Sequence, residues 1–455
     1  MLTLRSTSEP RQRTRALPLV AICLGYFMVI IDATAVSLSL PALGRDLGGG
    51  LGVLQWVVDG YTLAFATLLL SAGALGDRVG PHRVFCAGLT LFTVASAACG
   101  LAPTAGALVV ARLVQGAAAA ILVPSSLALL QAAHPDPRAQ ARAVGVWGGV
   151  AGIAAAFGPV VGGVLTDAAS WRLVFFVNVP IGLAALLLTV RYVVRPEGHG
   201  RRGLDLGAQA AAVAALGLLT FALIQARTRG WVSPIVLGGL AVAVLSAAAF
   251  VAVERRSADP MLPLGLFRSA AFSGGNAVGL LINLGFYGQL FVVSLFFQDV
   301  RRMSPTPAGL ALVPEGILVS LASFLSGRMT GRSGTRPTML IGLVTGAAGL
   351  FALMAVGRST PYPLLMIPLL AAGFGMAFTM PAATTTVVGA APPERAGVAS
   401  GAINAARQVG STVGVALLGT LGAGGRLAAP MAGAGAAFLA GAVVVAIFVR
   451  SRPRR

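Results

Sequence analysis

The sequence predicts an all-α protein that crosses a membrane fourteen times, as two repeated halves of six helices with two helices inserted between them. Three observations predict this fold class. The 455 residues are 56% hydrophobic and 10% charged, whereas soluble domains carry about 25% charged residues. Long apolar stretches recur from one end of the chain to the other, and motifs of the first six stretches recur in the last six. There are too few charges to cover several water-soluble domains.

Apolar stretches of about 18 to 25 residues, separated by short charged segments, are typical of transmembrane helices. The predicted spans are 17–41, 53–75, 82–102, 105–131, 143–167, 171–192, 205–224, 231–253, 270–298, 308–327, 337–356, 361–389, 398–422 and 430–449. The chain accordingly divides into a cytoplasmic tail, an N-terminal half, an inserted two-helix linker, a C-terminal half and a second tail. Their boundaries are 1–16, 17–195, 196–256, 257–449 and 450–455.

The distribution of basic residues predicts the orientation. All 33 are Arg, and the net charge is +19. If the N-terminus is cytoplasmic, 23 of them fall in cytoplasmic segments and 8 in outer loops, while Arg112 and Arg407 lie within spans. This bias fits the positive-inside rule and predicts that both termini are cytoplasmic. The positive charge is therefore a topology signal that predicts no nucleic-acid partner. The loops are too short for a catalytic domain, so we expect no enzyme.

An internal repeat relates the two outer groups of six spans. Three features of one segment recur, in the same order, 257 residues later. They are Gly116, Pro124 and Arg138-Ala139, matched by Gly373, Pro381 and Arg395-Ala396. The constant offset indicates duplication. Two repeated halves around a site at the membrane midplane are the architecture of many secondary transporters.

Four charged residues within the spans are the candidates for proton coupling: Asp32, Asp59, Glu315 and Arg112. Charges in hydrocarbon cost several kcal/mol and are functional hypotheses by default. The histidines all lie in cytoplasmic segments, Lys is absent and Arg does not titrate. Any proton carrier must therefore be one of the three carboxylates. An Arg112–carboxylate pair that breaks on protonation would be a switch; the alternatives are a permanent ion pair or an Arg112 side chain that reaches outward.

Two further sets are candidates for helix contact and substrate binding. Gly158, Pro159, Gly162 and Gly163 lie in span 143–167, where small residues allow close helix approach and Pro permits a bend. The alternative is ordinary packing. The candidates for the substrate cavity are Tyr26, Tyr61, Asn276, Asn283, Tyr287, Asn404 and Gln408. Polar stripes of this kind either line a cavity or hold helices together, and the tyrosines could equally be core residues.

The cytoplasmic loop GALGDRVGPHR, residues 73–83, is the candidate gate. Its glycines permit a tight turn. Asp77 lies near the start of the next span, where a carboxylate suits the helix dipole. The candidate gate residues are Gly73, Asp77, Arg78, Gly80 and Arg83. The alternative is a charged turn that only follows the positive-inside rule.

These segments resemble the major facilitator superfamily, specifically its 14-span drug:proton antiporters. GALGDRVGPHR resembles the superfamily's motif A, although Pro81 stands where a basic residue is usual. IDATAVSLSLPAL and QWVVDGYTLAFA are similar to the first two antiporter spans, and ARLVQG resembles motif B. FGPVVGGVLTDAASWRLVFFVNVPIG resembles antiporter motif C with its loop, and GAINAARQVGSTVGVALLG the eleventh repeat helix. The likeness covers nearly the whole chain.

The resemblance implies a major facilitator fold and roles for single residues. Asp77 would belong to the cytoplasmic gate, Arg112 to proton transfer, and Asp32 to coupling or cation recognition. The helix contact associated with antiport would comprise Gly158, Pro159, Gly162 and Gly163. The role of Glu315 rests on its depth in the membrane alone.

The expected function is proton-driven export, by alternating access, of hydrophobic compounds such as antibiotics or dyes, cationic ones among them. We expect a multi-pass protein of the inner (plasma) membrane that works as a monomer. Its expected partners are the lipid bilayer, hydrophobic small molecules and protons. No cofactor and no metal are expected, because the proton gradient supplies the energy. The alternatives are export of one endogenous metabolite, or a transport-inactive sensor or assembly protein on the same fold.

Overall fold

The computed structural model describes residues 9–48, 50–133, 136–196, 206–257, 260, 262–392, 396–422 and 424–449. These ranges are helical and contain no β-strand, which confirms the prediction of an all-α protein. The helices are α1 (Glu9–Leu47), α2 (Leu51–Val79), α3 (Pro81–Gly100), α4 (Ala105–Ala133), α5 (Pro137–Ala168), α6 (Leu173–Phe176), α7 (Asn178–Tyr192), α8 (Leu206–Arg229), α9 (Pro234–Arg256), η1 (Leu264–Arg268), α10 (Ala270–Leu295), η2 (Phe296–Val300), α11 (Pro305–Ser333), α12 (Thr335–Ala352), η3 (Leu353–Ala355), α13 (Tyr362–Gly389), α14 (Ala396–Leu421) and α15 (Ala428–Phe448).

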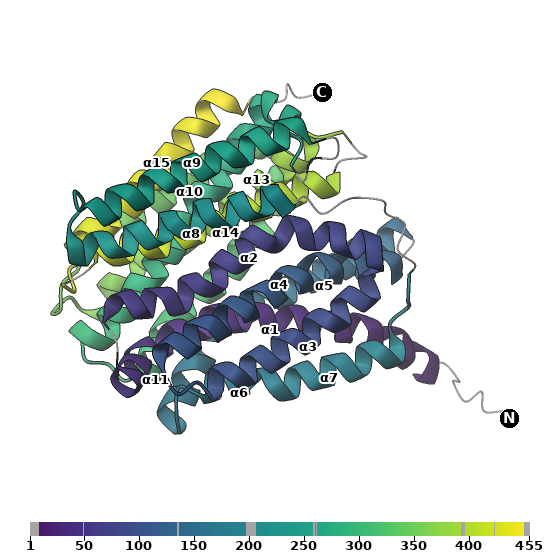
Figure 1. The fold of residues 1–455 in the computed structure, drawn as a ribbon, viewed down its shortest axis with the longest axis horizontal. Helices are drawn as coiled ribbons and strands as arrows, with labels where there is room; N and C mark the ends of the chain where they lie inside the picture. The colour runs from purple at the N-terminus through teal and green to yellow at the C-terminus, as the bar shows by residue number, and fades with distance from the viewer. Residues whose placement is uncertain are drawn as a thin grey trace, which may run out of the picture.

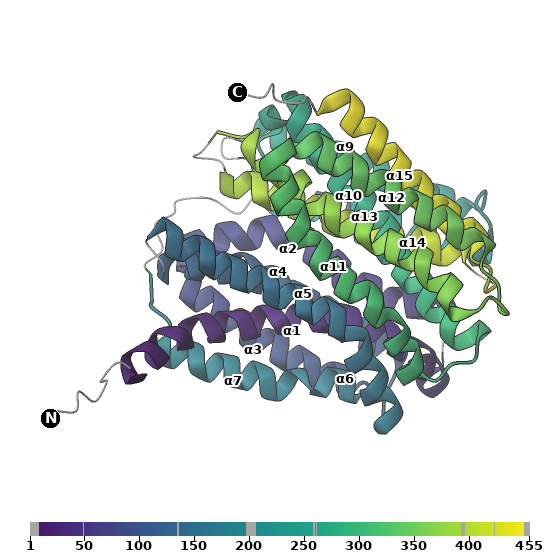
Figure 2. The ribbon, with the colours of Figure 1, turned by 180° about the vertical axis from the view of Figure 1, so that it is seen from behind.

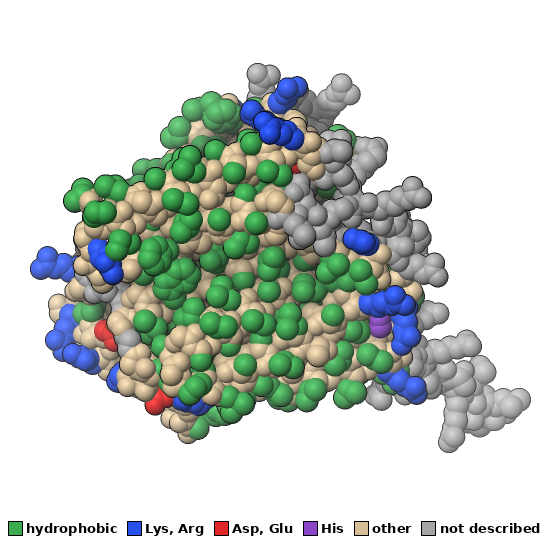
Figure 3. All heavy atoms as spheres, viewed as in Figure 1, with side chains coloured by type: hydrophobic (Ala, Val, Ile, Leu, Met, Phe, Trp, Pro, Cys, Tyr) green, Lys and Arg blue, Asp and Glu red, His purple; other side chains and the backbone are tan. Residues whose placement is uncertain are grey.

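Within the described residues, twelve helices are long and apolar enough to cross a membrane, or thirteen if the two arms of α5 count as one span. Helix α14 is 26 residues long but is not among them. Its centre carries Asn404, Arg407 and Gln408, which lower its hydropathy. The count of fourteen crossings therefore remains a prediction. Charged side chains on the face in Figure 3 lie toward two opposite ends, with a broad hydrophobic band between them.

Helix α5 is bent by 43° between its arms Val146–Ala155 and Phe157–Ala168. The bend has an identifiable cause in Pro159. A proline ring collides with the carbonyl group four residues earlier and removes one hydrogen bond of the helix. The carbonyl four residues before Pro159 belongs to Ala155, where the first arm ends.

The helices form two bundles. Helices α1 to α7 pack mainly on one another, as do α10 to α15, and the two bundles lie one above the other in Figure 1. Helix α1 begins and α15 ends on the same side of the molecule, which we call the terminal end. The opposite side, where α1 ends at Leu47 and α2 begins at Leu51, is called the far end.

The bundles meet mainly through two pairs of helices, α5 with α11 and α2 with α14, and α1 also contacts α10 and α11. In Figure 2, α11 runs diagonally from the second bundle onto α5. Helices α8 and α9 form a hairpin beside this interface, and α8 contacts both α2 and α14. Gln209 of α8 donates to the carbonyl of Thr67 in α2 (2.8 Å), and Thr420 of α14 donates to the carbonyl of Leu223 in α8 (3.1 Å). Helix α8 is thus hydrogen-bonded to both bundles.

Candidate functional site

A buried ion pair joins two of the four predicted coupling residues. Asp32 of α1 and Arg112 of α4 are each 1% exposed, and their Oδ2 and NH1 atoms are 2.5 Å apart. Gln115 donates to Asp32 Oδ1 at 2.9 Å, and Asn178 donates to the same oxygen at 2.9 Å. Both carboxylate oxygens therefore have partners. Such satisfaction is what allows a charge pair to remain ionised away from water.

The Arg112 guanidinium is held on several sides. Its Nε atom donates to the carbonyl of Val57 (2.9 Å), and its NH1 atom also donates to Gln115 Oε1 (2.7 Å). Gln115 in turn donates to Ser96 Oγ of α3 (2.8 Å). The ring of Tyr61 lies 4.2 Å from the guanidinium carbon, at a distance typical of a cation–π contact. Residues of α1, α2 and α4 thus hold this arginine, while α3 joins the group through Gln115 and α7 through Asp32.

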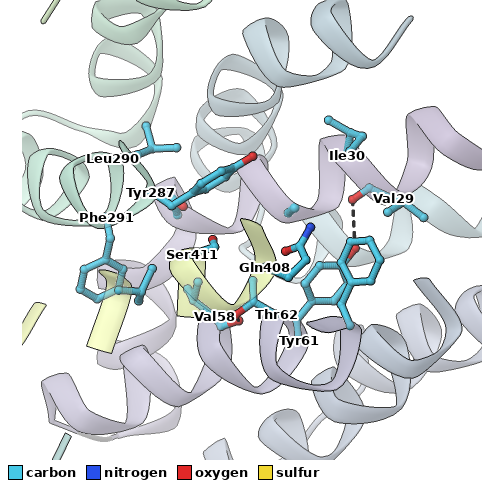
Figure 4. Close-up of a pocket in the computed structure, with 14 residues that line it drawn as sticks. Val29, Ile30, Val58, Tyr61, Thr62, Tyr287, Leu290, Phe291, Gln408 and Ser411 are labelled. Carbon is cyan, nitrogen blue, oxygen red and sulfur yellow. Dashed lines mark hydrogen bonds between the residues drawn. The ribbon is translucent and has the colours of Figure 1, made fainter. Parts of the chain in front are cut away.

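A cavity lies between the bundles, next to this ion pair. Four helices line it: α1, α2, α10 and α14 (Figure 4). The lining includes three predicted cavity residues, Tyr61, Tyr287 and Gln408. The cavity measures ≈ 40 Å³, which suits a few water molecules and not a drug-sized ligand. The two bundles are therefore close together at this level.

Tyr61 connects the cavity with the ion pair. It lines the cavity on one side, and its ring lies against Arg112 on the other. Its hydroxyl donates to the carbonyl of Val29 in α1 (3.1 Å), the bond drawn dashed in Figure 4. The side chain is 1% exposed and is fixed at both ends. A rearrangement of the Asp32–Arg112 pair or of the cavity would therefore be passed to the other through the Tyr61 ring.

The remaining predicted cavity residues lie outside the cavity lining. Asn276 and Asn283 are buried and donate to carbonyls of their own helix, those of Phe272 and Gly279. Asn404 donates to the Ser400 carbonyl and accepts a hydrogen bond from Arg407 (3.1 Å).

Tyr26 stacks on a tryptophan of the same bundle. Its ring lies 3.8 Å from that of Trp147 on α5, with only 6° between the ring planes.

Asp59 and Glu315 do not join Arg112. Asp59 is fully buried on the face of α2 that contacts α14, between Gln55 and Thr62, and neither carboxylate oxygen has a hydrogen-bond partner. Glu315 lies in the other bundle, on α11, beside Gly373 of α13 and with Oε1 unpartnered. Of the four predicted coupling residues, only Asp32 and Arg112 are partners.

The GPVVGG segment of α5 is a contact surface on two sides. A Cβ atom at Gly158 or Gly162 would collide with Thr34 or Ala35 of α1, and one at Gly163 would collide with the Pro305 carbonyl of α11. From α11, a Cβ at Gly309 would lie 2.5 Å from the Pro159 carbonyl oxygen. The small residues therefore bring α5 against α1 and, across the bundle interface, against α11.

The candidate gate loop joins α2 to α3 through Gly80, whose φ of +99° is one that glycine tolerates. Arg78 and Arg83 are exposed. Gly73 and Asp77 fall within α2, and their side-chain surroundings lie outside the described residues.

Sequence reasoning did not single out Gln115 or assign Asn178 a contact. Gln115 follows Arg112 by three residues, one helical turn on the same face, so a polar side chain beside a buried charge was a usable signal. Asn178 begins α7 and donates to Asp32 from there. Periodicity gives the face of a helix on which Asn178 lies but not which helix that face contacts.

Known proteins resemble this chain along most of its length. A family model described as "Major Facilitator Superfamily" matches residues 22–314 and 276–455. The chain belongs to the Major Facilitator Superfamily. It is 38% identical over 405 residues to a methylenomycin A resistance protein of Streptomyces coelicolor, covering 89% of this chain and 85% of that protein. It is 39% identical over 410 residues to the multidrug resistance protein Stp of Mycobacterium tuberculosis, covering 90% and 76%.

The superfamily fold is also found among solved structures. A peptide transporter crystallised with sulfate superposes with a TM-score of 0.71 at 14% identity, covering 95% of this chain and 94% of that one. This likeness shows the fold alone. As a superfamily member with at least twelve helices able to span a membrane, the chain is a multi-pass protein of the inner membrane.

Proposed function

We propose that this chain is a proton-coupled exporter of hydrophobic small molecules, antibiotics and dyes among them, that works by alternating access. The observation that carries the proposal is the contact of Tyr61 with both the Asp32–Arg112 pair and the cavity between the bundles. A proton site and a substrate site that share one side chain can influence each other. The names of the relatives, which are resistance proteins, support drugs as the cargo.

Protonation of Asp32 would change the balance of this network. Removing one partner of a buried ion pair leaves the other charge uncompensated, at a cost of about 3–5 kcal/mol. Arg112 would then seek other acceptors, and the ring of Tyr61 would have to follow the guanidinium. Substrate that contacts Tyr61, Tyr287 and Gln408 would favour one arrangement of the bundles, and the proton would favour the other.

Asp59 and Glu315 are proposed as additional proton sites. Both are buried, and neither has an Arg partner among the described residues. Asp59 has no donor at either oxygen and Glu315 has none at Oε1. A buried carboxyl group with so few donors is tolerated far better protonated than ionised. Asp59 also lies at the contact between the bundles, so a change in its charge would bear directly on that contact.

We further propose that α5 and α14 complete fourteen crossings and that both termini are cytoplasmic. In this topology, glycines of α5 and α11 indicate on which side of the membrane the interface between the bundles is closed. At the far end they are in close contact (Gly163, Gly309), whereas a Cβ at Gly148 or Gly327, nearer the terminal end, would meet nothing within 4 Å. The helices thus diverge toward the terminal end, which is the cytoplasmic side in this topology. Epitope tags on both termini should be accessible only after the membrane is permeabilised.

The test of the proposed function is transport by Asp32→Asn in proteoliposomes with an imposed pH gradient. We expect the variant to fold and bind a recognised dye but to lose its uphill accumulation. Asp46→Asn is the matched control, because Asp46 is a half-exposed carboxylate paired with Arg172 outside the cavity. Undiminished uphill transport by Asp32→Asn would refute proton coupling at this residue. A panel of unrelated substrates separates a multidrug exporter from one dedicated to a single metabolite.

A further inference from the structure

A cationic side chain without a carboxylate partner lies at the approach to the cavity. Arg407 on α14 is partly exposed. Its NH1 atom donates to Asn404, and its Nε atom has no hydrogen-bond partner. The ion pairs among the described residues are Asp32–Arg112 and Asp46–Arg172, so no carboxylate neutralises Arg407 there. An unpaired guanidinium in the membrane region is energetically costly, and its presence therefore points to a functional role.

The position of Arg407 places it on the route to the cavity. It is one residue before Gln408 and one helical turn before Ser411, both of which line the cavity. The aliphatic part of the Arg407 side chain passes Gly279 of α10. Its Cγ atom lies 3.6 Å from the point that a Cβ atom at Gly279 would occupy. Since α14 runs from the terminal end toward the far end, Arg407 lies on the terminal side of the cavity. That is the side toward which α5 and α11 diverge.

An aromatic surface lies in the same layer as Arg407, the layer one helical turn from the cavity on its terminal side. Tyr26 precedes the cavity-lining residues Val29 and Ile30 by one turn of α1, just as Arg407 precedes Ser411 by one turn of α14. Its ring is stacked on Trp147, and both residues are partly exposed. The layer therefore offers a flat π surface from the first bundle and a fixed positive charge from the second.

The carboxylates cannot balance that charge. No carboxylate of the described residues lines the cavity. Asp32 is bound to Arg112, its side chain has no exposed surface, and Tyr61 stands between this pair and the cavity. Asp59 is fully buried, and Glu315 is 4% exposed in the other bundle. An organic cation entering here would meet Arg407 with no opposite charge, whereas an acid would supply the missing partner.

We propose that Arg407, with the Tyr26–Trp147 pair, is a binding subsite for the acidic group of planar aromatic substrates, and that the exporter prefers aromatic acids to aromatic cations. A guanidinium binds a carboxylate through two parallel hydrogen bonds, and stacked aromatic contacts add affinity for a planar ring. The proposal rests on the proposed export function for its biological meaning. It replaces the expectation of cationic cargo with an acidic one.

The test compares two probes with one ring system, pyrenebutyrate and its trimethylammonium counterpart, for binding to the purified full-length protein in nanodiscs. Empty nanodiscs give the background from lipid partitioning. We expect at least about tenfold tighter binding of the acid. Arg407→Gln should abolish that preference by weakening acid binding alone, and Arg407→Lys should retain much of it. Arg358→Gln, which removes an exposed arginine outside the cavity, should leave it unchanged.

The outcomes are decisive because binding is measured without a proton gradient. Tighter binding of the cation, equal binding of both probes, binding of neither, or an equal loss of both in Arg407→Gln would overturn the subsite. If the acid preference depends on Arg407 but no probe is transported along a pH gradient, the subsite stands and the proposed export function fails. If Asp32→Asn alone loses uphill transport while retaining acid preference, both proposals are supported.

Discussion

At the scale of single residues, the Asp32 carboxylate is the most completely coordinated of the three acids within the membrane. Arg112, Gln115 and Asn178 each donate to it from a different direction along α4 and α7. Asp59, in contrast, has no donor at either oxygen. Two acids that are equally buried thus present different chemistry. One is stabilised as an anion by its donors, and the other is best accommodated as a neutral acid.

Replacement of Gln115 by Leu tests the supporting network while keeping both members of the ion pair. The variant nearly keeps the side-chain volume but removes the hydrogen bonds of Gln115 with Asp32, Ser96 and Arg112. Loss of these bonds inside the protein should cost about 1–3 kcal/mol of stability. Asp32 keeps Arg112 and Asn178 as donors but is held less firmly. We therefore expect slower uphill transport along a pH gradient, while substrate binding without a gradient stays unchanged. A variant with reduced stability but undiminished uphill transport would assign Gln115 a packing role only.

At the scale of helices, the two ends of α5 behave differently. Its C-terminal arm packs against α1 and α11 through glycine, whereas Gly148 in its first arm has no neighbour within 4 Å of the Cβ position. In the proposed alternating-access cycle, the contact at the far end and the space at the terminal end would belong to one conformation. The bend that separates the arms follows from Pro159 and was predictable from sequence.

Substituting Gly163→Ala should shift the conformational equilibrium. Its new methyl group would collide with the Pro305 carbonyl, so the far-end contact between α5 and α11 must open. Overpacking of this kind costs about 1–3 kcal/mol, which would change the ratio of two states by about 5- to 150-fold. Distances between spin labels at the far ends of α5 and α11 should lengthen. Gly148→Ala is the control and should leave this distance distribution unaltered. Identical distributions for both variants would show that Gly163 is not a contact that closes the far end.

Much of this helical arrangement could be predicted from the sequence, and the failures have physical causes. Apolar length alone located most spans, because a helix in lipid must be apolar over its exposed surface. Helix α14 defeats that criterion because α2, α8 and α10 surround it, so its polar residues avoid lipid. The sequence could not show which of Asp32, Asp59 and Glu315 is the partner of Arg112. The position of a residue along a helix does not show toward which neighbouring helix its side chain points. The position of α8 against both bundles has no signature in its own sequence.

At the scale of the whole molecule, one chain supplies both walls of the cavity, and the bundles are in contact above it at the far end. Two hydrogen bonds link α2 and α14 across the interface between the bundles. Gln55 donates to the carbonyl of Ala416 on the far side of the cavity (3.0 Å). At the level of the cavity, Thr412 donates to the lining residue Thr62 (3.0 Å between the hydroxyl oxygens). These bonds must break if the bundles rock to open the far end. Helix α8, bonded to both bundles, must yield or move with one of them.

A disulfide across this contact tests whether separation of the bundles is required for transport. Thr62→Cys combined with Thr412→Cys, in a background where Cys23, Cys86 and Cys99 are replaced, places two thiols where the hydroxyls now meet. Oxidation should hold α2 against α14, because a disulfide fixes its Cβ atoms about 3.5–4.5 Å apart. We expect oxidised protein to bind substrate from the terminal end but to lose transport, and a thiol reductant to restore it. Each single cysteine variant should transport with or without oxidant. Full transport by the cross-linked protein would mean that the bundles do not part between α2 and α14, and that the route out of the cavity lies elsewhere along the interface.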